Sequence, residues 1–272
     1  MLTLESVTYR YAGARTPSLH EINLELHDGE VLGIVGASEA GKTTLCLVAS
    51  GLAPRTVGGR LTGRVLLDGS DTAPVAMHEL AGQVGIAFAS PASQLSGVAG
   101  TVYEEVAFGP MNLGVPRSEL IARTEEALTA LRIESLADRD PTQLSGGQQQ
   151  LVAIAGLLAL RPAHLVLDEP TAQLDPAGTA MVAAALARLA ADGASILIAE
   201  QKTDLLAEIC SRVVALSSGR AMLDGLAADV LANPRLAELG VAAPAAVRLR
   251  RAAGDANLDS RVLTRLEKAL AT

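Results

Sequence analysis

Aromatic side chains are almost absent from this chain of 272 residues, which contains no Trp, 2 Phe and 3 Tyr. Hydrophobic residues still make up 49% of the sequence, so a large core is possible, but it must be built from Leu, Val, Ile and Ala. The length suits one large α/β domain with at most a small additional piece.

Cysteine, positive charge and long apolar runs are also scarce. Cys46 and Cys210 both fall in expected helices, where they favour small buried hydrophobes over a metal pair or a disulfide. The 22 basic and 30 acidic residues give a net charge of −8, which argues against a general nucleic-acid surface. The longest apolar run, residues 151–160, is too short to span a bilayer, and the N-terminus has no secretory signal pattern. We therefore expect a soluble protein that meets a membrane only by docking on a membrane partner.

The stretch of residues 36–44, Gly-Ala-Ser-Glu-Ala-Gly-Lys-Thr-Thr, has the pattern of a phosphate-binding loop. It follows an apolar run at residues 30–35, which predicts a buried strand, and it precedes residues 45–49, which predict the first turns of a helix. A glycine-containing turn without a ligand is the weaker interpretation, because both the spacing and the strand–helix context fit.

The residue types of this loop follow from the chemistry of phosphate. Backbone N–H groups at a helix N-terminus carry partial positive charge and point at the ligand. Gly36 and Gly41 allow a tight turn that brings the backbone close to phosphate oxygens. Lys42 is expected to bridge the β- and γ-phosphates, and the Thr43 hydroxyl is expected to hold a magnesium ion.

A second apolar run, residues 165–167, ends in Asp168 and Glu169 and predicts a central strand with two carboxylates at its end. In a chain with a phosphate loop, Asp168 suits magnesium binding through water, and Glu169 suits activation of the attacking water as a general base. An acidic strand end before the turn at Pro170 is the alternative, which the presence of Lys42 and Thr43 makes weaker.

Other strands are expected at residues 1–10, 20–27, 64–67, 84–88 and 195–199, and a hairpin at 212–223. Helices are expected at residues 101–108, 117–131, 149–160, 179–192 and 203–210. Thr101 is the expected N-cap of the first of these helices, and Pro110 is expected to break it. Beyond residue 225 we expect short helices, one of which presents Arg248, Arg250 and Arg251 as a solvated face.

Two further features bear on a nucleotide site. Residues 144–148, Leu-Ser-Gly-Gly-Gln, open the apolar helix at 149–160, and glycines ahead of a helix make its N-terminus receptive to anions. Tyr9 and Tyr11 end the first strand, where an exposed ring could stack on a base. Packing of a strand-end tyrosine against the core is an equally good interpretation.

The phosphate loop, the 144–148 motif and the acidic strand end about twenty residues later resemble the ATP-binding subunit of ATP-binding-cassette (ABC) transporters. The resemblance covers the chain from Tyr11 to about Gly225 and implies an α/β fold. That fold has a P-loop NTPase core with a mixed sheet, an antiparallel β subdomain and a helical subdomain. We accordingly expect an ATP-binding domain over residues 1–225, with its helical subdomain at about 90–160, and a C-terminal helical extension over 226–272.

In this family residues 36–43 are the Walker A loop, 144–148 the signature motif, 165–168 the Walker B strand and 174–175 the D-loop. The implied cofactors are ATP and Mg²⁺. The resemblance implies nucleotide contacts from Tyr11, Gly36, Ala37, Ser38, Glu39, Ala40, Gly41, Lys42, Thr43, Thr44, Ser145, Gly146, Gly147, Gln148 and Asp175. It implies magnesium ligands from Thr43 and Asp168, and catalytic roles for Glu169, Lys42 and Gln201.

A narrower resemblance is to the energy-coupling-factor and cobalt/nickel importer branch. It rests on residues 91–95 (Pro-Ala-Ser-Gln-Leu), 101–110, 112–116 and 200–202. It implies two ATP-binding subunits, identical or different, that sandwich two nucleotides between the Walker motifs of one and the signature motif of the other. It also implies an integral-membrane coupling subunit, a substrate-binding membrane subunit, a place on the cytoplasmic face of the cell membrane, and uptake of a vitamin or transition-metal ion driven by ATP hydrolysis.

Three residues depart from the family pattern. Glu39 stands where glycine is usual, and a non-glycine residue with positive φ costs roughly 1–2 kcal/mol. Ala89 replaces the glutamine that touches the magnesium site, and Gln94 matches a separate, second glutamine of the branch. Gln201 replaces the switch histidine, and an amide cannot accept and hold a proton as imidazole can. We therefore predict slow hydrolysis at this chain's own Walker face and an intact signature motif that completes a faster site on a different subunit.

Two other classes stay open. A soluble cassette ATPase acting on DNA or ribosomes usually has long coiled-coil insertions or two cassettes joined by a charged linker, and this acidic sequence shows neither. A regulatory subunit that binds nucleotide without useful hydrolysis is supported by the three departures and opposed by the retained Glu169.

Overall fold

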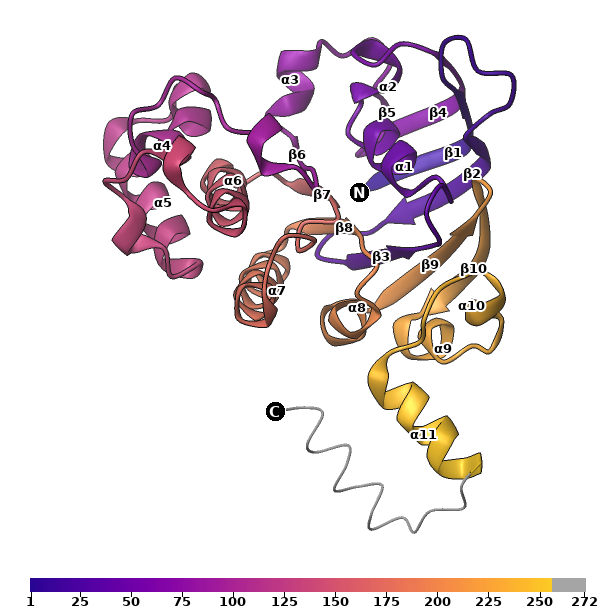
Figure 1. The fold of residues 1–272 in the computed structure, drawn as a ribbon. Coiled ribbons are helices and arrows are strands. Elements are labelled where there is room, and N and C mark those ends of the chain that lie inside the picture. Colours follow the sequence, from indigo (N-terminus) through magenta and orange to yellow (C-terminus); the bar gives the residue numbers. More distant parts are fainter. Residues whose placement is uncertain (256–272) are drawn as a thin grey trace.

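Two sheets of different kinds form the centre of the molecule in the computed structural model, which describes residues 1–255 (Figure 1). The larger is a 6-stranded sheet in the order β10-β9-β3-β8-β7-β6. Its strands from β9 to β6 pair in parallel, and β10 is antiparallel to β9, so the sheet is mixed. The smaller is a 4-stranded antiparallel sheet in the order β2-β1-β4-β5. Together with the helices, these sheets confirm the expected α/β fold with an antiparallel β part.

The strands are β1 (Leu2–Arg10), β2 (Leu19–Leu26), β3 (Val31–Val35), β4 (Arg60–Leu67), β5 (Ser70–Asp71), β6 (Val84–Ala87), β7 (His164–Asp168), β8 (Ser195–Ala199), β9 (Arg212–Ser217) and β10 (Arg220–Leu226). The α-helices are α1 (Lys42–Ala49), α2 (Leu52–Arg55), α3 (Met77–Ala81), α4 (Val102–Asn112), α5 (Arg117–Ala130), α6 (Gly146–Leu160), α7 (Pro176–Ala191), α8 (Thr203–Ile209), α9 (Ala227–Leu231), α10 (Arg235–Glu238) and α11 (Ala245–Asp255).

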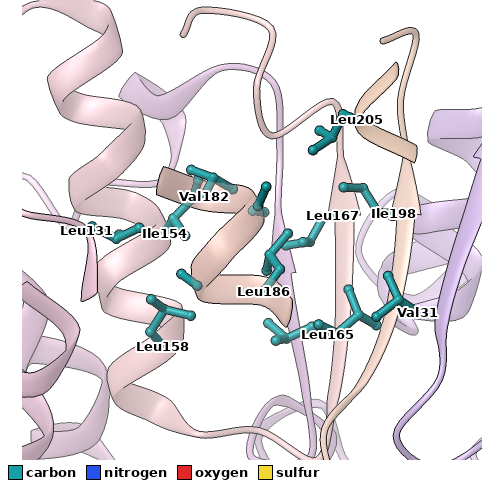
Figure 2. Packing of buried hydrophobic residues seen from close by; sticks show 14 of the residues in the cluster. Val31, Leu131, Ile154, Leu158, Leu165, Leu167, Val182, Leu186, Ile198 and Leu205 are labelled. Atoms are coloured by element: carbon teal, nitrogen blue, oxygen red, sulfur yellow. The ribbon is translucent and has the colours of Figure 1, made fainter. Parts of the chain in front are cut away.

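Alternate residues of the central strands face two different cores, which is why these strands are continuously apolar. Leu165, Leu167 and Ile198 point to the helical side, where Figure 2 shows them against Val182 and Leu186 of α7. Their neighbours along β7 and β8 face the other core, which α1 and the antiparallel sheet share. The 6-stranded sheet is thus covered on both faces by an aliphatic core, as the composition requires.

Helices α4, α5 and α6 pack on one another beyond β6, on the side of the molecule away from the antiparallel sheet (Figure 1). Thr101 caps α4 as predicted: its side chain accepts a hydrogen bond from the Glu104 N–H, and the Glu104 carboxylate accepts one from the Thr101 N–H. The prediction that Pro110 breaks this helix was wrong, because α4 continues to Asn112. A proline this close to the helix end removes one backbone hydrogen bond, and buried Pro110 packs inside the helical group.

Several other boundaries differ from those predicted. The connection expected at residues 51–63 contains α2 and the first half of β4, and α3 was not foreseen. Cys210 is the residue that ends α8 rather than a residue within it, although both cysteines are buried as expected. Arg248, Arg250 and Arg251 are exposed on α11, where Arg251 donates to the carbonyl of Ala232 at 2.7 Å. The rest of the expected C-terminal extension, residues 256–272, lies outside the described residues.

Candidate active site

The predicted phosphate loop connects the end of β3 to the start of α1, and its two glycines are sterically required. A Cβ at Gly36 would lie 2.7 Å from the Leu216 carbonyl oxygen and 2.8 Å from the Ala40 Cβ. Gly41 has φ of 104°, and a Cβ there would meet the Ser18 carbonyl oxygen at 2.9 Å. No side chain caps α1, so its first N–H groups face the loop without a side-chain acceptor. This arrangement fits an anionic oxygen ligand.

Lys42, the first residue of α1, is buried, and its ammonium is held inside the loop. Nζ donates to the carbonyl oxygens of Gly36 at 2.9 Å and Ala37 at 3.2 Å. It also lies 3.8 Å from Oε1 of Glu169, which directly follows β7, the second strand from β3 in the sheet. The loop therefore combines one positive side chain with a ring of backbone dipoles, as phosphate recognition needs.

Asp168 is the last residue of β7 and is buried, with its Oδ1 lacking any hydrogen-bond partner among the described residues. Burial raises the pKa of Asp168, and a hydrogen bond with the Thr43 side chain acts in the opposite direction. A buried carboxylate oxygen without a partner, next to a hydroxyl, is a donor set that suits a hard cation such as Mg²⁺. The structure therefore places the Thr43 and Asp168 side chains next to each other, and their role as magnesium ligands stays a prediction.

Glu169 follows Asp168 directly, and Gln201 reaches it from the end of β8. The parallel pairing of Asp168 with Ala199 sets these two strand ends side by side. The Gln201 Nε2 atom donates to Oε1 of Glu169 at 2.7 Å, and the Glu169 backbone adopts a φ of 49°. The structure thus joins Lys42, Glu169 and Gln201 into one polar cluster at the carboxyl ends of parallel strands.

Residues on both sides of Gln201 tie its segment to the loop after β7, a connection that sequence reasoning missed. The buried carboxylate of Glu200 accepts hydrogen bonds from the N–H and the hydroxyl of Thr171, at 3.1 and 2.5 Å. The Lys202 ammonium donates to the carbonyl oxygens of Thr171 at 2.7 Å and Leu174 at 3.3 Å. The sequence did contain a signal for this connection: Glu200 and Lys202 carry opposite charges on either side of Gln201. Charged side chains that become buried need partners, so both residues were candidates for contacts with a nearby loop.

The 144–148 motif forms the N-terminus of α6. Ser145 is the N-cap, its Oγ accepts from the Gln148 N–H at 3.3 Å, and the Gln148 Oε1 accepts from the Ser145 N–H at 3.0 Å. Ser145 and Gly146 are exposed, and none of the motif's hydrogen bonds within residues 1–255 reaches the phosphate loop. One chain therefore does not bring the two motifs together.

Gln173 is a second residue that sequence reasoning missed. Its Nε2 donates to the carbonyl oxygen of Ala89 at 3.3 Å, and its Oε1 would lie 2.5 Å from a Cβ at Gly146.

Two other predicted residues make local hydrogen bonds. The Gln94 side chain accepts from the Phe88 N–H and donates to the Phe88 carbonyl oxygen, at 3.0 Å each, so it stabilises its own loop. Asp175 caps α7, with Oδ1 accepting from the Gly178 N–H at 2.7 Å.

The two tyrosines have different environments. Tyr9 is fully buried and its hydroxyl donates to the Gly58 carbonyl, so it packs against the core and is not available for stacking. Tyr11 is half-buried, meets the Tyr9 ring edge-on at 5.0 Å, and its hydroxyl lies 3.1 Å from the Thr44 Oγ1. The structure therefore places Tyr11, and not Tyr9, beside the phosphate loop.

Glu39 is exposed and has φ of 64°, so the loop does require at this position the conformation that favours glycine.

Within residues 1–255 we find no helix with the length and apolar character needed to cross a bilayer.

A phosphate loop with a buried lysine, facing two carboxylates at the end of a parallel strand, defines a P-loop nucleoside-triphosphatase. Residues 19–172 match the family described as ABC transporter. The chain belongs to the ABC transporter family, and it is an ATP-binding subunit with ATPase activity, which converts ATP and water to ADP and phosphate.

Named relatives agree with this assignment. A putative ABC transporter ATP-binding protein of Pyrococcus horikoshii is 41% identical over 92% of this chain and 88% of its own length. The cobalt import ATP-binding protein CbiO of Rhodobacter capsulatus is 40% identical over 92% and 87%. The energy-coupling factor transporter ATP-binding protein EcfA1 of Halalkalibacterium halodurans is 38% identical over 92% and 88%.

Solved structures show the same fold. CbiO1 of Clostridium perfringens, described as part of the ABC transporter complex CbiONQ, has 31% identity and a TM-score of 0.76, covering 98% of each chain. An ATP-binding cassette solved as a dimer in a post-hydrolysis state with ADP and phosphate has 27% identity and a TM-score of 0.73, covering 84% of this chain and 99% of the other.

Proposed function

We propose that this chain is the ATP-binding subunit of a membrane importer of the energy-coupling-factor type. It works on the cytoplasmic face of the membrane, with a second ATP-binding subunit, an integral-membrane coupling subunit and a substrate-binding membrane subunit. Its ATP hydrolysis drives uptake of a vitamin or a transition-metal ion.

The separation of the two nucleotide-binding motifs supports a site shared between subunits. Lys42, Asp168 and Glu169 converge at one edge of the 6-stranded sheet, whereas Ser145 lies exposed on α6 with no hydrogen bond to them. A helix N-terminus that faces solvent, without a hydrogen bond to the phosphate loop of its own chain, is placed to contact a nucleotide that another subunit holds. The cassette relative that was solved as a dimer with ADP and phosphate supports the same arrangement.

The relatives support the transport assignment. Names among them include cobalt import and energy-coupling factor, and the CbiO1 structure belongs to a transporter complex. We infer membrane partners of the same kind for this chain, and a small cargo that these partners bind.

The roles of the site residues follow from their positions. The loop N–H groups and Lys42 would hold the β- and γ-phosphates, and Tyr11 would contact the base. Thr43 and Asp168 would hold magnesium, which neutralises charge that develops on the transferred phosphoryl group. Glu169 would orient and deprotonate the attacking water.

The Gln201–Glu169 hydrogen bond supports slow hydrolysis at this site. Gln201 holds one oxygen of the carboxylate at 2.7 Å, but its amide cannot take up a proton during the reaction. Ala89 contributes only a backbone carbonyl, which Gln173 binds. The Walker face of this chain therefore binds ATP and turns it over slowly, while its signature motif serves a faster partner site.

The test is ATP turnover by the purified chain, alone and in the assembled transporter. We expect low turnover alone, a rise with Gln201→His, and a loss of roughly a hundredfold with Glu169→Gln while Mg-ATP binding is retained. A wild-type rate that equals that of a histidine-containing relative, and that Gln201→His leaves unchanged, would remove the slow-site proposal. Copurification with nucleic acid in place of membrane proteins would overturn the transport proposal.

The same hydrogen bond also favours a second candidate, a regulatory subunit that binds nucleotide without useful hydrolysis. A single-turnover measurement in the assembled transporter separates the two. Release of phosphate from the nucleotide bound by this chain supports the slow ATPase, and retention of intact ATP supports the regulatory subunit.

A further inference from the structure

Three ionisable side chains converge at the edge of the molecule opposite the nucleotide site. Asp28 lies in the turn between β2 and β3, Asp68 lies in the turn between β4 and β5, and His164 is the first residue of β7. Their possible ligand atoms all lie within 4.8 Å of one another. None of the three has a role in the proposed chemistry of ATP.

The two carboxylates are directed at one cationic position. The ammonium of Met1 donates to Oδ1 of Asp28 at 2.6 Å and to Oδ1 of Asp68 at 2.5 Å. Both carboxylates are otherwise exposed, and both face the position that the ammonium occupies.

His164 supplies the independent observation that points to a ligand. It is only 2% exposed, yet its Nδ1 has no hydrogen-bond partner among the described residues. A buried ring nitrogen without a partner is costly unless something binds it.

We propose that Asp28, Asp68 and His164 form a binding site for a first-row divalent transition-metal ion, distinct from the nucleotide-bound magnesium. One imidazole nitrogen and two carboxylate oxygens are donor types that zinc and other first-row divalent ions accept, and imidazole disfavours Mg²⁺ or Ca²⁺. The ion displaces the ammonium of Met1 from the carboxylates.

The site is well separated from the ATP site. His164 and Asp168 are the two ends of β7, so four residue steps of roughly 3.3 Å place them about 13 Å apart. Asp68 lies in a turn of the antiparallel sheet, Asp28 lies in the turn that connects the two sheets, and His164 belongs to the 6-stranded sheet. A bound ion therefore joins the two sheets and stabilises the fold.

The test uses the full chain without an affinity tag, freed of metal by a chelator and titrated with Co²⁺ while excess Mg²⁺ is present. Visible absorption reports Co²⁺ binding, and Zn²⁺ is then added as a competitor. We expect one equivalent of Co²⁺ that Zn²⁺ displaces, and a rise in Tm of roughly 5 °C at a hundredfold excess of Zn²⁺ over Kd.

Matched variants locate the ion. Asp28→Asn, Asp68→Asn and His164→Gln should each weaken Co²⁺ binding at least tenfold. His78→Gln and Asp138→Asn, at exposed positions elsewhere, and Thr43→Val in the nucleotide site should leave it unchanged. The aspartate variants lie on exposed turns, so the test stands even where His164→Gln fails to fold. Absence of stoichiometric Co²⁺, unchanged binding in Asp68→Asn, or loss of binding in Thr43→Val would each overturn the proposal.

Discussion

At the scale of single residues, the phosphate loop depends on backbone conformations that few residues tolerate. Gly41 has φ of 104°, where any Cβ would also strike the Ser18 carbonyl. Glu39 has φ of 64° and carries a side chain in a region that suits glycine. The loop thus stores strain at Glu39, beside the position where an anion binds.

Replacing Glu39 with glycine should relieve this strain. The gain of roughly 1–2 kcal/mol exceeds the added chain entropy of glycine, so Glu39→Gly should raise the unfolding free energy by about 0.5–1 kcal/mol. Loss of a negative charge should also tighten ATP binding. Urea denaturation and a nucleotide titration measure both effects. Ser38→Gly is the matched control, because Ser38 lacks a positive φ and should lose stability. Equal behaviour of the two variants would show that position 39 is unstrained.

Asp168 gives a pH-dependent prediction. Folding raises its pKa above the usual 3.8, so the folded chain binds more protons than the unfolded chain between the two values. The contribution of Asp168 to stability is therefore greatest below that window and is lost as pH rises through it. Above the window, the unpartnered Oδ1 destabilises the nucleotide-free fold by on the order of 1 kcal/mol.

Asp168→Asn should accordingly be more stable than the wild type at about pH 7.5, without nucleotide or divalent cations. The difference should shrink as the pH approaches 4. Denaturation curves at several pH values measure it, with exposed Asp138→Asn as the control. A variant that is less stable at every pH would mean that the hydrogen bond with Thr43 outweighs the cost of burial.

At the scale of elements, two helices begin with the same device. Thr101 with Glu104 caps α4, and Ser145 with Gln148 caps α6, each as a reciprocal capping box. The two caps are locally equivalent, but only the start of α6 belongs to the proposed intersubunit site. Comparing the Thr101 cap with the Ser145 cap therefore separates the effect of losing a helix cap on stability from an effect on ATP turnover.

Ser145→Ala and Thr101→Ala should each lower the unfolding free energy by about 1 kcal/mol, because each removes one cap acceptor. Only Ser145→Ala should reduce ATP turnover of the assembled transporter, by roughly tenfold or more, because it also removes a donor to the partner's nucleotide. Thermal denaturation and steady-state turnover of both variants check this. Equal turnover of the two variants would contradict a role of Ser145 beyond the cap.

The elements that the sequence predicted well are those whose signal is local. The apolar runs of β3, β7 and β8, the loop between β3 and α1, and the Thr101 cap follow from neighbouring residues alone. The prediction that Pro110 ends α4 was wrong because burial within the α4–α6 group outweighs the single hydrogen bond that proline removes. The charges beside Gln201 indicate that Glu200 and Lys202 need partners, but they do not say which. The links from Lys202 to the Thr171 carbonyl and from Gln173 to the Ala89 carbonyl join residues distant in sequence, so only the fold identifies the partners.

At the scale of the whole molecule, parallel topology concentrates the chemistry at one edge. Strands β3, β7 and β8 are parallel neighbours, so Lys42, Asp168 and Gln201 follow their carboxyl ends and meet. Ser145 belongs to the helical group on the far side of β6 and remains exposed. In our proposal a complete nucleotide site therefore needs two chains. Because Gln201 stands where the family has histidine, the rate of hydrolysis depends on which chain supplies the Walker face.

Mixing of two inactive variants tests which pair forms. Lys42→Ala removes the Walker face, and Ser145→Arg blocks the signature face, so a mixed pair of these chains contains one intact composite site. If the chain works as a homodimer, the mixture should recover up to about half of the turnover of the full transporter. We expect almost no recovery of that rate, because the intact composite site in such a pair still uses the Gln201-containing Walker face that we propose to be slow. Adding the other ATP-binding subunit of the same transporter to Lys42→Ala should instead raise turnover at least tenfold, since the intact Ser145 face then serves a faster partner. A mixture of the two variants that alone reaches half of the full transporter rate would establish a homodimer and end the argument for asymmetry.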